Sequence, residues 1–251
     1  MPCVSIIIPT LNEAVVLDRT LRQLTILDPP AGEVIVVDGG SEDQTIEVAK
    51  RVCELFARGI KLQVLSCPKR GRSIQMNYAA RAATGDILCL LHADTWVPDD
   101  LIAVIEQTLA EPAIACGGFI SLMVGSRSTR WGISLHNYLK TYYAPLMFKP
   151  HMFLRGLRLL FGDQVMFCRR NDFWDCGGFN EELPIMEDGD LCLRLFTKGR
   201  IYLVKRVVQS SDRRVARWGS WKATAIYFYI GFLWGIGVNT TYLKKFYEDI
   251  R

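Results

Sequence analysis

Four acidic residues lie where a binding site for a metal-bound diphosphate is expected. Asp38 and Asp94 each come at the end of an apolar run, and Glu187 and Asp188 come later, just before a predicted helix. Parallel α/β sheets place ligand and metal chemistry at the carboxyl ends of their strands. We therefore expect these acids to share one site, which holds a metal–diphosphate group and removes a proton beside it.

Asp94 is the expected metal ligand. Mg²⁺ and Mn²⁺ in nucleotide sites take one or two protein carboxylates, and substrate phosphates supply further ligands. One aspartate at a strand end is therefore sufficient. His92 is expected to pack beside the site, because carboxylate and water suit these ions better than imidazole. Direct ligation by His92 is the alternative.

Glu187 and Asp188 have two interpretations. They can be charges at the start of a helix, where the helix dipole favours acids. Alternatively, one of them is a general base that takes the proton of an acceptor hydroxyl while a metal stabilises a departing diphosphate. One base is enough for an inverting displacement at a sugar carbon.

Basic residues supply candidate phosphate contacts. Arg72 opens a predicted helix, and a helix N-terminus with basic neighbours suits an anion. Arg213-Arg214 and Arg217-Trp218 form a later cluster, in which the planar fork of arginine suits a diphosphate. An ordinary solvated surface is the alternative for each group.

Two turns carry polar residues that suit a nucleoside. Pro9-Thr10-Leu11-Asn12-Glu13 follows the first apolar run, and Asp38-Gly39-Gly40-Ser41 follows the second. Neither is a glycine-rich dinucleotide loop or a P-loop. Helix capping is the structural alternative for both. Because both turns are expected at the same sheet edge as Asp94, a base and a ribose can bind across that edge.

Strands and helices alternate through the first half of the chain. Apolar runs predict strands at 4–8, 34–37, 62–65, 87–91 and 114–119, and the intervening patterns predict helices near 13–24, 43–57, 72–83 and 99–109. This alternation predicts βαβ units and a mostly parallel sheet covered on both faces. Further along, we expect a strand at 165–168, a helix at 188–198 and a strand at 201–204.

Composition narrows the class of protein. The 251 residues, half of them hydrophobic, suit one large domain or one domain with an appendage. The net charge of +4 is too small to argue for nucleic acid. The eight cysteines form no CxxC pair, and the first residues lack a secretory signal core. We therefore expect a reduced, cytosolic protein.

Two segments depart from the strand–helix rhythm. No acid occurs between Pro112 and Asp163, and the basic, aromatic-rich stretch 121–160 suits a phosphate-facing or membrane-facing surface, or else a solvated helix face. The segment from Ala223 to Leu243 has no charge, but its apolar part is shorter than the roughly 20 residues that span a bilayer. We expect a helix packed on the domain and partly in the membrane interface; an internal or dimer-forming helix is the alternative.

The order and spacing of the motifs resemble the family 2 inverting glycosyltransferases of GT-A fold, from Val4 to about Trp218. The motifs are Pro9-Thr10-Leu11-Asn12-Glu13, Val37-Asp38-Gly39-Gly40-Ser41, Gly85-Asp86, His92-Ala93-Asp94, Gly177-Gly178-Phe179 and Glu187-Asp188. Four segments, 71–77, 91–95, 162–164 and 186–188, look like a bacterial subgroup labelled arsenosugar-biosynthesis glycosyltransferases.

The resemblance implies an α/β fold of GT-A type, Rossmann-like, with a mostly parallel central sheet flanked by helices. Residues 1–218 would form this domain, with a nucleotide-sugar-binding half (1–120) and an acceptor and base half (121–218). Beyond the resemblance, the charge-free run from Ala223 to Leu243 leads us to expect a hydrophobic C-terminal helical segment over 219–251, with the membrane interface as one candidate environment.

The resemblance also implies roles for single residues. Asp94 would bind the metal, and Asp188 would be the base, with Glu187 as the alternative. The nucleotide-sugar site would be formed by Pro9, Asn12, Glu13, Asp38, Gly40, Ser41, Arg72, Asn77, His92 and Ala93. The acceptor or diphosphate region would contain Gly162, Asp163, Gln164, Arg217 and Trp218. His92 stands where the metal motif of the family has its first acid.

The expected function is inverting transfer of a sugar from a nucleotide-diphospho-sugar, with a UDP-sugar favoured, to the hydroxyl of a small or lipid-like acceptor. Mn²⁺ or Mg²⁺ would be bound with the donor diphosphate. The alternatives are a catalytically degenerate GT-A protein that binds membrane surfaces, and a nucleotidyltransferase that makes nucleotide-sugars. We expect no nucleic-acid partner and a cytoplasmic location with peripheral contact at the inner face of the cell membrane. Both a monomer and an oligomer fit the sequence.

Overall fold

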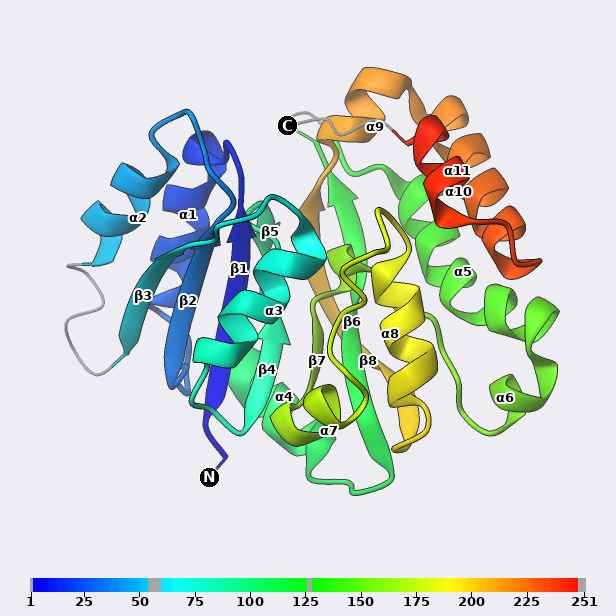
Figure 1. Ribbon diagram of the computed structural model, residues 1–251, viewed down its shortest axis with the longest axis horizontal. Helices are drawn as coiled ribbons and strands as arrows, with labels where there is room; N and C mark the ends of the chain where they lie inside the picture. Colours follow the sequence, from blue (N-terminus) through cyan, green and yellow to red (C-terminus); the bar gives the residue numbers. More distant parts are fainter. Residues whose placement is uncertain (1, 54–59, 126–127, 248–251) are drawn as a thin grey trace.

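One mixed sheet organises the chain in the computed structural model, which describes residues 2–53, 60–125 and 128–247 (Figure 1). Its strand order within those residues is β3-β2-β1-β4-β7-β6-β8-β5. The strands are β1 (Val4–Thr10), β2 (Glu33–Asp38), β3 (Lys61–Ser66), β4 (Ile87–Leu90), β5 (Thr95–Trp96), β6 (Ile114–Val124), β7 (Met166–Arg169) and β8 (Arg200–Ser211).

Helices connect the strands and cover the sheet. They are α1 (Ala14–Leu24), α2 (Thr45–Cys53), α3 (Arg72–Ala82), α4 (Leu101–Leu109), α5 (Trp131–Phe148), α6 (Pro150–Leu154), α7 (Arg170–Asp175), α8 (Glu187–Leu195), α9 (Arg213–Trp218), α10 (Ser220–Gly235) and α11 (Thr240–Leu243), with short 3₁₀ turns η2 (Gly162–Gln164) and η3 (Lys244–Phe246). The helix expected at 43–57 is α2, and residues 54–57 of that prediction lie outside the described part of the chain.

The register of the parallel strands brings the predicted acids to one edge. Strands β3, β2, β1 and β4 are parallel, and Thr10 at the end of β1 lies opposite Asp38 at the end of β2. The chain leaves β4 at the same edge, just before Asp94. The predicted mostly parallel sheet is confirmed, although β7 runs antiparallel between β4 and β6.

Two apolar cores, one on each face of the sheet, hold the layers together. Leu17, Val48 and Ile105 place α1, α2 and α4 in one core, and Ala79 and Leu191 place α3 and α8 in the other. The buried strands carry apolar side chains on both faces, as expected for strands that helices cover on both sides. The carboxyl edge of the sheet is therefore a fixed platform for side chains.

The second half departs from the predicted boundaries. Residue 120 lies within β6, which pairs with β8 over nearly its whole length, so the two predicted halves share one sheet. The charge-free C-terminal segment forms α10 and, after a break at Gly237, α11. Helix α10 packs along α5, with Phe232 against Phe148. Among the described residues, every helix is too short or too polar to cross a membrane.

Candidate active site

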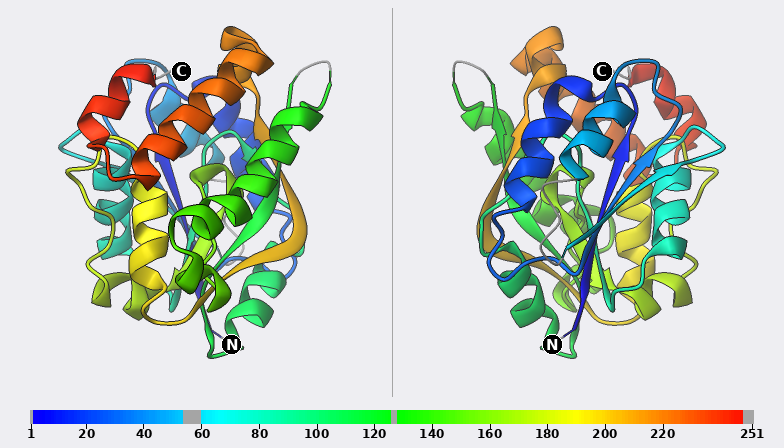
Figure 2. Two further views of the ribbon diagram at one scale, coloured as in Figure 1. Left: turned by 90° about the vertical axis from the view of Figure 1, so that its right-hand side faces the viewer. Right: turned by 90° about the vertical axis from the view of Figure 1, so that its left-hand side faces the viewer.

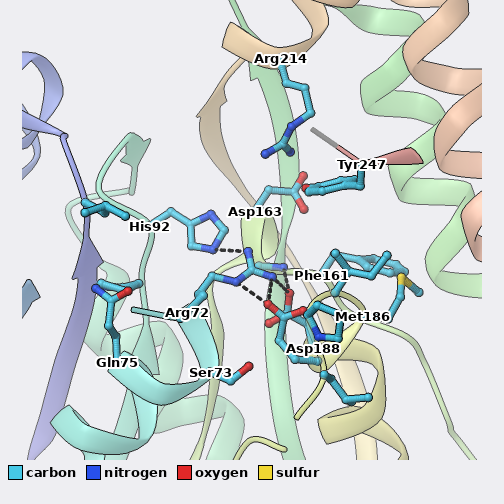
Figure 3. A pocket seen from close by; sticks show the side chains of 18 of the residues that line it. Arg72, Ser73, Gln75, His92, Phe161, Asp163, Met186, Asp188, Arg214 and Tyr247 are labelled. Atoms are coloured by element: carbon cyan, nitrogen blue, oxygen red, sulfur yellow. Dashed lines mark hydrogen bonds and ion pairs between the residues drawn. The ribbon is translucent and has the colours of Figure 1, made fainter. Parts of the chain in front are cut away.

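A cavity of about 820 Å³ opens at the carboxyl edge of the sheet, between the parallel strands and the C-terminal helices (Figure 3). It brings together predicted residues from both halves of the chain. Those that line it are Pro9, Glu13, Arg72, His92, Ala93, Asp94, Gly162, Asp163, Glu187 and Asp188. One cavity therefore gathers the metal-ligand and base candidates.

Arg72 connects Glu187 and Asp188, the two candidate bases, to His92. Figure 3 shows Arg72 between Asp188 and His92. The Nε of Arg72 donates to Glu187 Oε1 at 2.7 Å, and its Nη2 donates to Asp188 Oδ2 at 2.9 Å. Its Nη1 lies 3.2 Å from His92 Nε2. Arg72 opens α3, whereas Glu187 and Asp188 open α8, so two helix N-termini meet at this contact. Arg72, predicted to face the donor phosphates, here holds the acids instead.

Burial tunes the titration of this cluster. Burial raises the pKa of Asp188 to about 6, and the charge of Arg72 keeps the pKa from rising further. The same burial, together with Arg72, lowers the pKa of His92 to about 4. A neutral His92 accepts the Arg72 hydrogen bond through Nε2, so this nitrogen points to Arg72. A carboxylate with a pKa near neutrality suits a general base.

Backbone constraints hold Asp188 in place. Its Oδ2 also accepts from the backbone N–H of Gly162 at 2.9 Å. A side chain at Gly162 would overlap the His92 ring, so this turn requires glycine. Met186, just before the acids, has a φ of 67°, a conformation that costs a non-glycine residue about 1–3 kcal/mol. Such local strain occurs most often at functional sites.

Asp94 lies across the cavity, paired with an arginine. Arg213 Nη2 lies 2.8 Å from Asp94 Oδ2 and 2.9 Å from Glu13 Oε2. Within residues 2–53, 60–125 and 128–247, no three His, Cys, Asp or Glu side chains group closely enough to hold a metal alone. Asp94 fits the nucleotide-dependent kind of site, in which one carboxylate and the donor phosphates share the ion.

The turn after β2 does not line the cavity, contrary to its predicted place in the nucleotide-sugar site. The carboxylate of Asp38 accepts from the N–H groups of Gly40 and Ser41, both at 2.8 Å, and from Thr10 at 3.1 Å. Ser41 Oγ in turn accepts from the N–H of Asn12 at 2.9 Å. These four predicted residues (Asn12, Asp38, Gly40 and Ser41) brace the two turns, and Gly40 supplies the positive φ of 89°.

Four other predicted residues also lie outside the cavity lining. Asn77 is buried and holds Phe179 through both backbone groups at 2.9 Å, so it anchors the loop that leads to Glu187. Gln164 bonds with Thr141 at 3.1 Å and with the N–H of Phe161 at 3.0 Å, inside the wall. Arg217 points away, and Trp218 packs on Tyr227.

Arg217 and Trp218, predicted in the acceptor or diphosphate region, therefore do not line the cavity, whereas two arginines one helical turn earlier do. Arg213 and Arg214, four and three residues before Arg217, are the residues of α9 that line the cavity. Their type and clustering suggested a diphosphate contact, but only the folded chain places them. The Arg214 guanidinium stacks 4.3 Å from the centre of the Tyr247 ring.

The cavity wall formed by α5 and the C-terminal helices contains residues that the motifs do not identify. Lys140 of α5 lies with its Nζ 3.5 Å above the Phe161 ring, and burial lowers its pKa to about 8. Tyr227 of α10 and Tyr247, after η3, complete this wall. In the sequence, the feature that pointed to this wall was the stretch without acidic residues around Lys140. Within the predicted C-terminal helical segment, Tyr227, Ile230, Gly231, Lys244 and Tyr247 line the cavity.

The family comparison agrees with the motifs. The sequence model described as "Glycosyl transferase family 2" matches residues 5–177. A named relative, the PGL/p-HBAD biosynthesis glycosyltransferase of Mycobacterium bovis, is 29% identical over 199 residues, which cover 78% of this chain and 70% of that protein.

Two solved structures share the fold. The mannosyltransferase PcManGT from Pyrobaculum calidifontis, solved with GDP-Man and Mn²⁺, superposes with a TM-score of 0.71 at 22% identity, covering 94% of this chain and 64% of that one. Glucosyl-3-phosphoglycerate synthase from Mycobacterium tuberculosis, solved with Mn²⁺, UDP and phosphoglyceric acid, has a TM-score of 0.67 at 17% identity and covers 94% of this chain and 79% of that one. The fold is the GT-A fold that the motifs predict.

Replacing Arg72 by methionine tests the coupling between Arg72 and Asp188. The pKa of Asp188 in the fold, about 6, exceeds the roughly 3.9 of an unfolded aspartate, so its ionisation lowers stability as pH rises between these values. Without Arg72 this pKa rises further, and the loss grows and extends to higher pH. We expect Arg72→Met to lower the free energy of unfolding by about 3 kcal/mol near pH 8 and by much less near pH 5. Denaturant titration measures both, and an equal loss at the two pH values would contradict the coupling.

Proposed function

We propose that this chain, which belongs to glycosyltransferase family 2, transfers a sugar from a nucleotide-diphospho-sugar to an acceptor hydroxyl with inversion at the sugar carbon. The observation that carries the proposal is one cavity with two kinds of acid on opposite sides. Asp94 lies at the end of the parallel strands, and Asp188, with its pKa near 6, lies at the start of α8. The first suits a metal–diphosphate and the second suits a base.

The donor side is the cavity wall formed by Pro9, Glu13 and Asp94. A Mn²⁺ or Mg²⁺ ion held by Asp94 together with the donor would neutralise charge on the departing diphosphate. Both solved neighbours described above contain Mn²⁺ with a nucleotide ligand, GDP-Man in one and UDP in the other, which supports a divalent ion and a nucleoside diphosphate. The sequence resemblance favours a UDP-sugar as the donor.

Asp188 would act as the base. The acceptor oxygen attacks the sugar carbon, its proton passes to the Asp188 carboxylate, and the bond between that carbon and the diphosphate oxygen breaks on the opposite face. The backbone N–H of Gly162 and the guanidinium of Arg72 both donate to Oδ2 of this carboxylate and hold it in place. A single base of this kind produces inversion, because no covalent intermediate forms between donor and enzyme.

Arg213 would exchange partners during the cycle. Its guanidinium neutralises Glu13 and Asp94. When a donor diphosphate and its metal reach Asp94, the arginine is close enough to turn to the phosphate oxygens, for which its planar fork is well suited. The protein therefore keeps a positive charge beside the leaving group.

A nucleotidyltransferase is the less favoured enzyme. Such enzymes usually have a glycine-rich, arginine-containing loop after the first strand, but this chain has Pro9-Thr10-Leu11-Asn12-Glu13 there. The family model that matches the chain also describes glycosyltransferases.

Asp188→Asn tests the base. We expect donor binding to persist and the release of nucleoside diphosphate to fall by about 100-fold or more, because an amide cannot take the proton. The matched variant Glu187→Gln should keep more activity. Calorimetric titration of the donor and a coupled assay for the released nucleoside diphosphate give the two values. Near-normal turnover of Asp188→Asn would move the base to Glu187 or elsewhere.

Asp94→Ala tests the metal site. In isothermal titration of UDP, GDP and dTDP, we expect the wild type to bind one nucleotide best with Mn²⁺, and the variant to lose at least about tenfold in that affinity. With a chelator present, wild type and variant should bind equally, which controls for damage to the fold. Unchanged affinity of Asp94→Ala with Mn²⁺ would remove this role, and absence of nucleotide binding to the wild type would favour a degenerate binding protein.

A further inference from the structure

Helix α10 is apolar around its whole circumference, yet seven of its sixteen residues are exposed. Lys222 is the one charged residue of its sequence, and only Ala223 and Ile230 of residues 220–235 are buried. A helix that is apolar on all sides is usually enclosed by a protein core or by lipid. The rest of its surface is therefore open to a partner outside residues 2–53, 60–125 and 128–247.

The uncovered surface continues onto α5, which lies beside α10 at the edge of the molecule (Figure 2). Aromatic contacts join the two helices, between Tyr143 and Phe228 and between Phe148 and Phe232. We call the resulting surface the docking face. Its exposed apolar side chains include Trp131, Leu139, Met147, Trp221, Phe228 and Phe232. Single exposed apolar residues are ordinary, but a contiguous face of this kind marks an interaction surface.

The charge on and around this face has one sign. Residues 128–162 and 213–247, which include α5, α6, α9, α10 and α11, contain no aspartate or glutamate. They do contain lysines, among them Lys149, Lys222 and Lys245. Aromatic side chains with neighbouring lysines suit the headgroup region of an anionic bilayer. The same charge disfavours a second copy, because a two-fold contact would bring two basic faces together.

The docking face adjoins the acceptor side of the cavity. Lys140 of α5 and Gly231 of α10 line both the cavity and a shallow gap between the two helices, in which Met147, Phe228 and Phe232 also take part. Tyr227, on the turn before Gly231, lines the cavity as well. A molecule held at the docking face with its polar end inward would therefore meet the wall that leads to Asp188.

We propose that the docking face binds peripherally to an anionic lipid bilayer, and that the acceptor is a lipid whose hydroxyl enters the cavity along the seam between α5 and α10. Binding would be interfacial, with the helices lying in the headgroup layer, since none of the described helices can cross a membrane. The acceptor assignment rests on the proposed sugar transfer, whereas the docking itself does not.

Vesicle flotation of the full chain tests the docking. The wild type should float with vesicles of phosphatidylcholine and phosphatidylglycerol, and less with phosphatidylcholine alone. The double variant Trp131→Ser/Trp221→Ser should lose at least about tenfold in vesicle affinity, because it removes two large interfacial side chains. These side chains are 69% and 91% exposed, so the fold does not depend on them. Val15→Ser, at a 95% exposed residue of α1, is the matched control and should float like the wild type.

Charge reversal gives a second variant pair. Lys222→Glu should weaken flotation with the anionic vesicles, whereas Lys61→Glu, on the exposed edge strand β3, should not. The docking is overturned if the wild type stays unbound, or if the tryptophan variant floats equally well. It is also overturned if light scattering shows a wild-type dimer that the tryptophan substitutions dissociate, since a second copy would then cover the face.

Release of nucleoside diphosphate without vesicles separates docking from catalysis. If flotation fails while release persists, the docking face is wrong and the proposed sugar transfer stands. If flotation follows the variants but added lipid never raises release, the docking stands and the lipid acceptor is wrong. If lipid raises release in the wild type and not in the tryptophan variant, both parts are supported.

Discussion

The ion pair of Arg72 with Glu187 and Asp188 is the contact on which the site depends. It joins side chains 115 and 116 residues apart and brings the N-termini of α3 and α8 together. Burial alone would favour the protonated acid, and the guanidinium limits that effect, so that the pKa of Asp188 stays near 6. One half-buried cation thus positions the candidate base and keeps its pKa near 6. The remaining elements fix the place of this cluster relative to Asp94.

Several contacts outside the chemistry maintain that geometry. Gln75 bonds to the carbonyls of Thr10 and Val37 at 2.8 and 2.9 Å, and so ties α3 to the ends of β1 and β2. On the other side, Ile185 packs with Ile230 and Leu243, which fixes the C-terminal helices beside α8. The C-terminal helices therefore have two functions in this account: they close the cavity, and their outer surface faces the proposed membrane.

Local patterns could predict most of the strands and the edge at which the acids lie, because apolar runs and parallel connections are encoded within short segments. Local patterns could not predict that the Asp38 carboxylate accepts hydrogen bonds from its own turn, because the N–H groups of Gly40 and Ser41 can donate either to a ligand or to this carboxylate. The pairing of Arg213 with Asp94 spans 119 residues and needs the folded chain. The strand predicted at 114–119 extends to Val124 in β6, because its pairing with β8 continues past the local apolar pattern.

The pH dependence of turnover tests the central claim, that Asp188 works as a base tuned by Arg72. Nucleoside-diphosphate release should be measured from about pH 5 to about pH 8 at saturating donor and metal. The account predicts a turnover rate that rises with an apparent pKa of about 6 and is constant above it, with the rise shifted to higher pH in Arg72→Met. A rate that is independent of pH over this range, or a rise that Arg72→Met leaves unmoved, would contradict it.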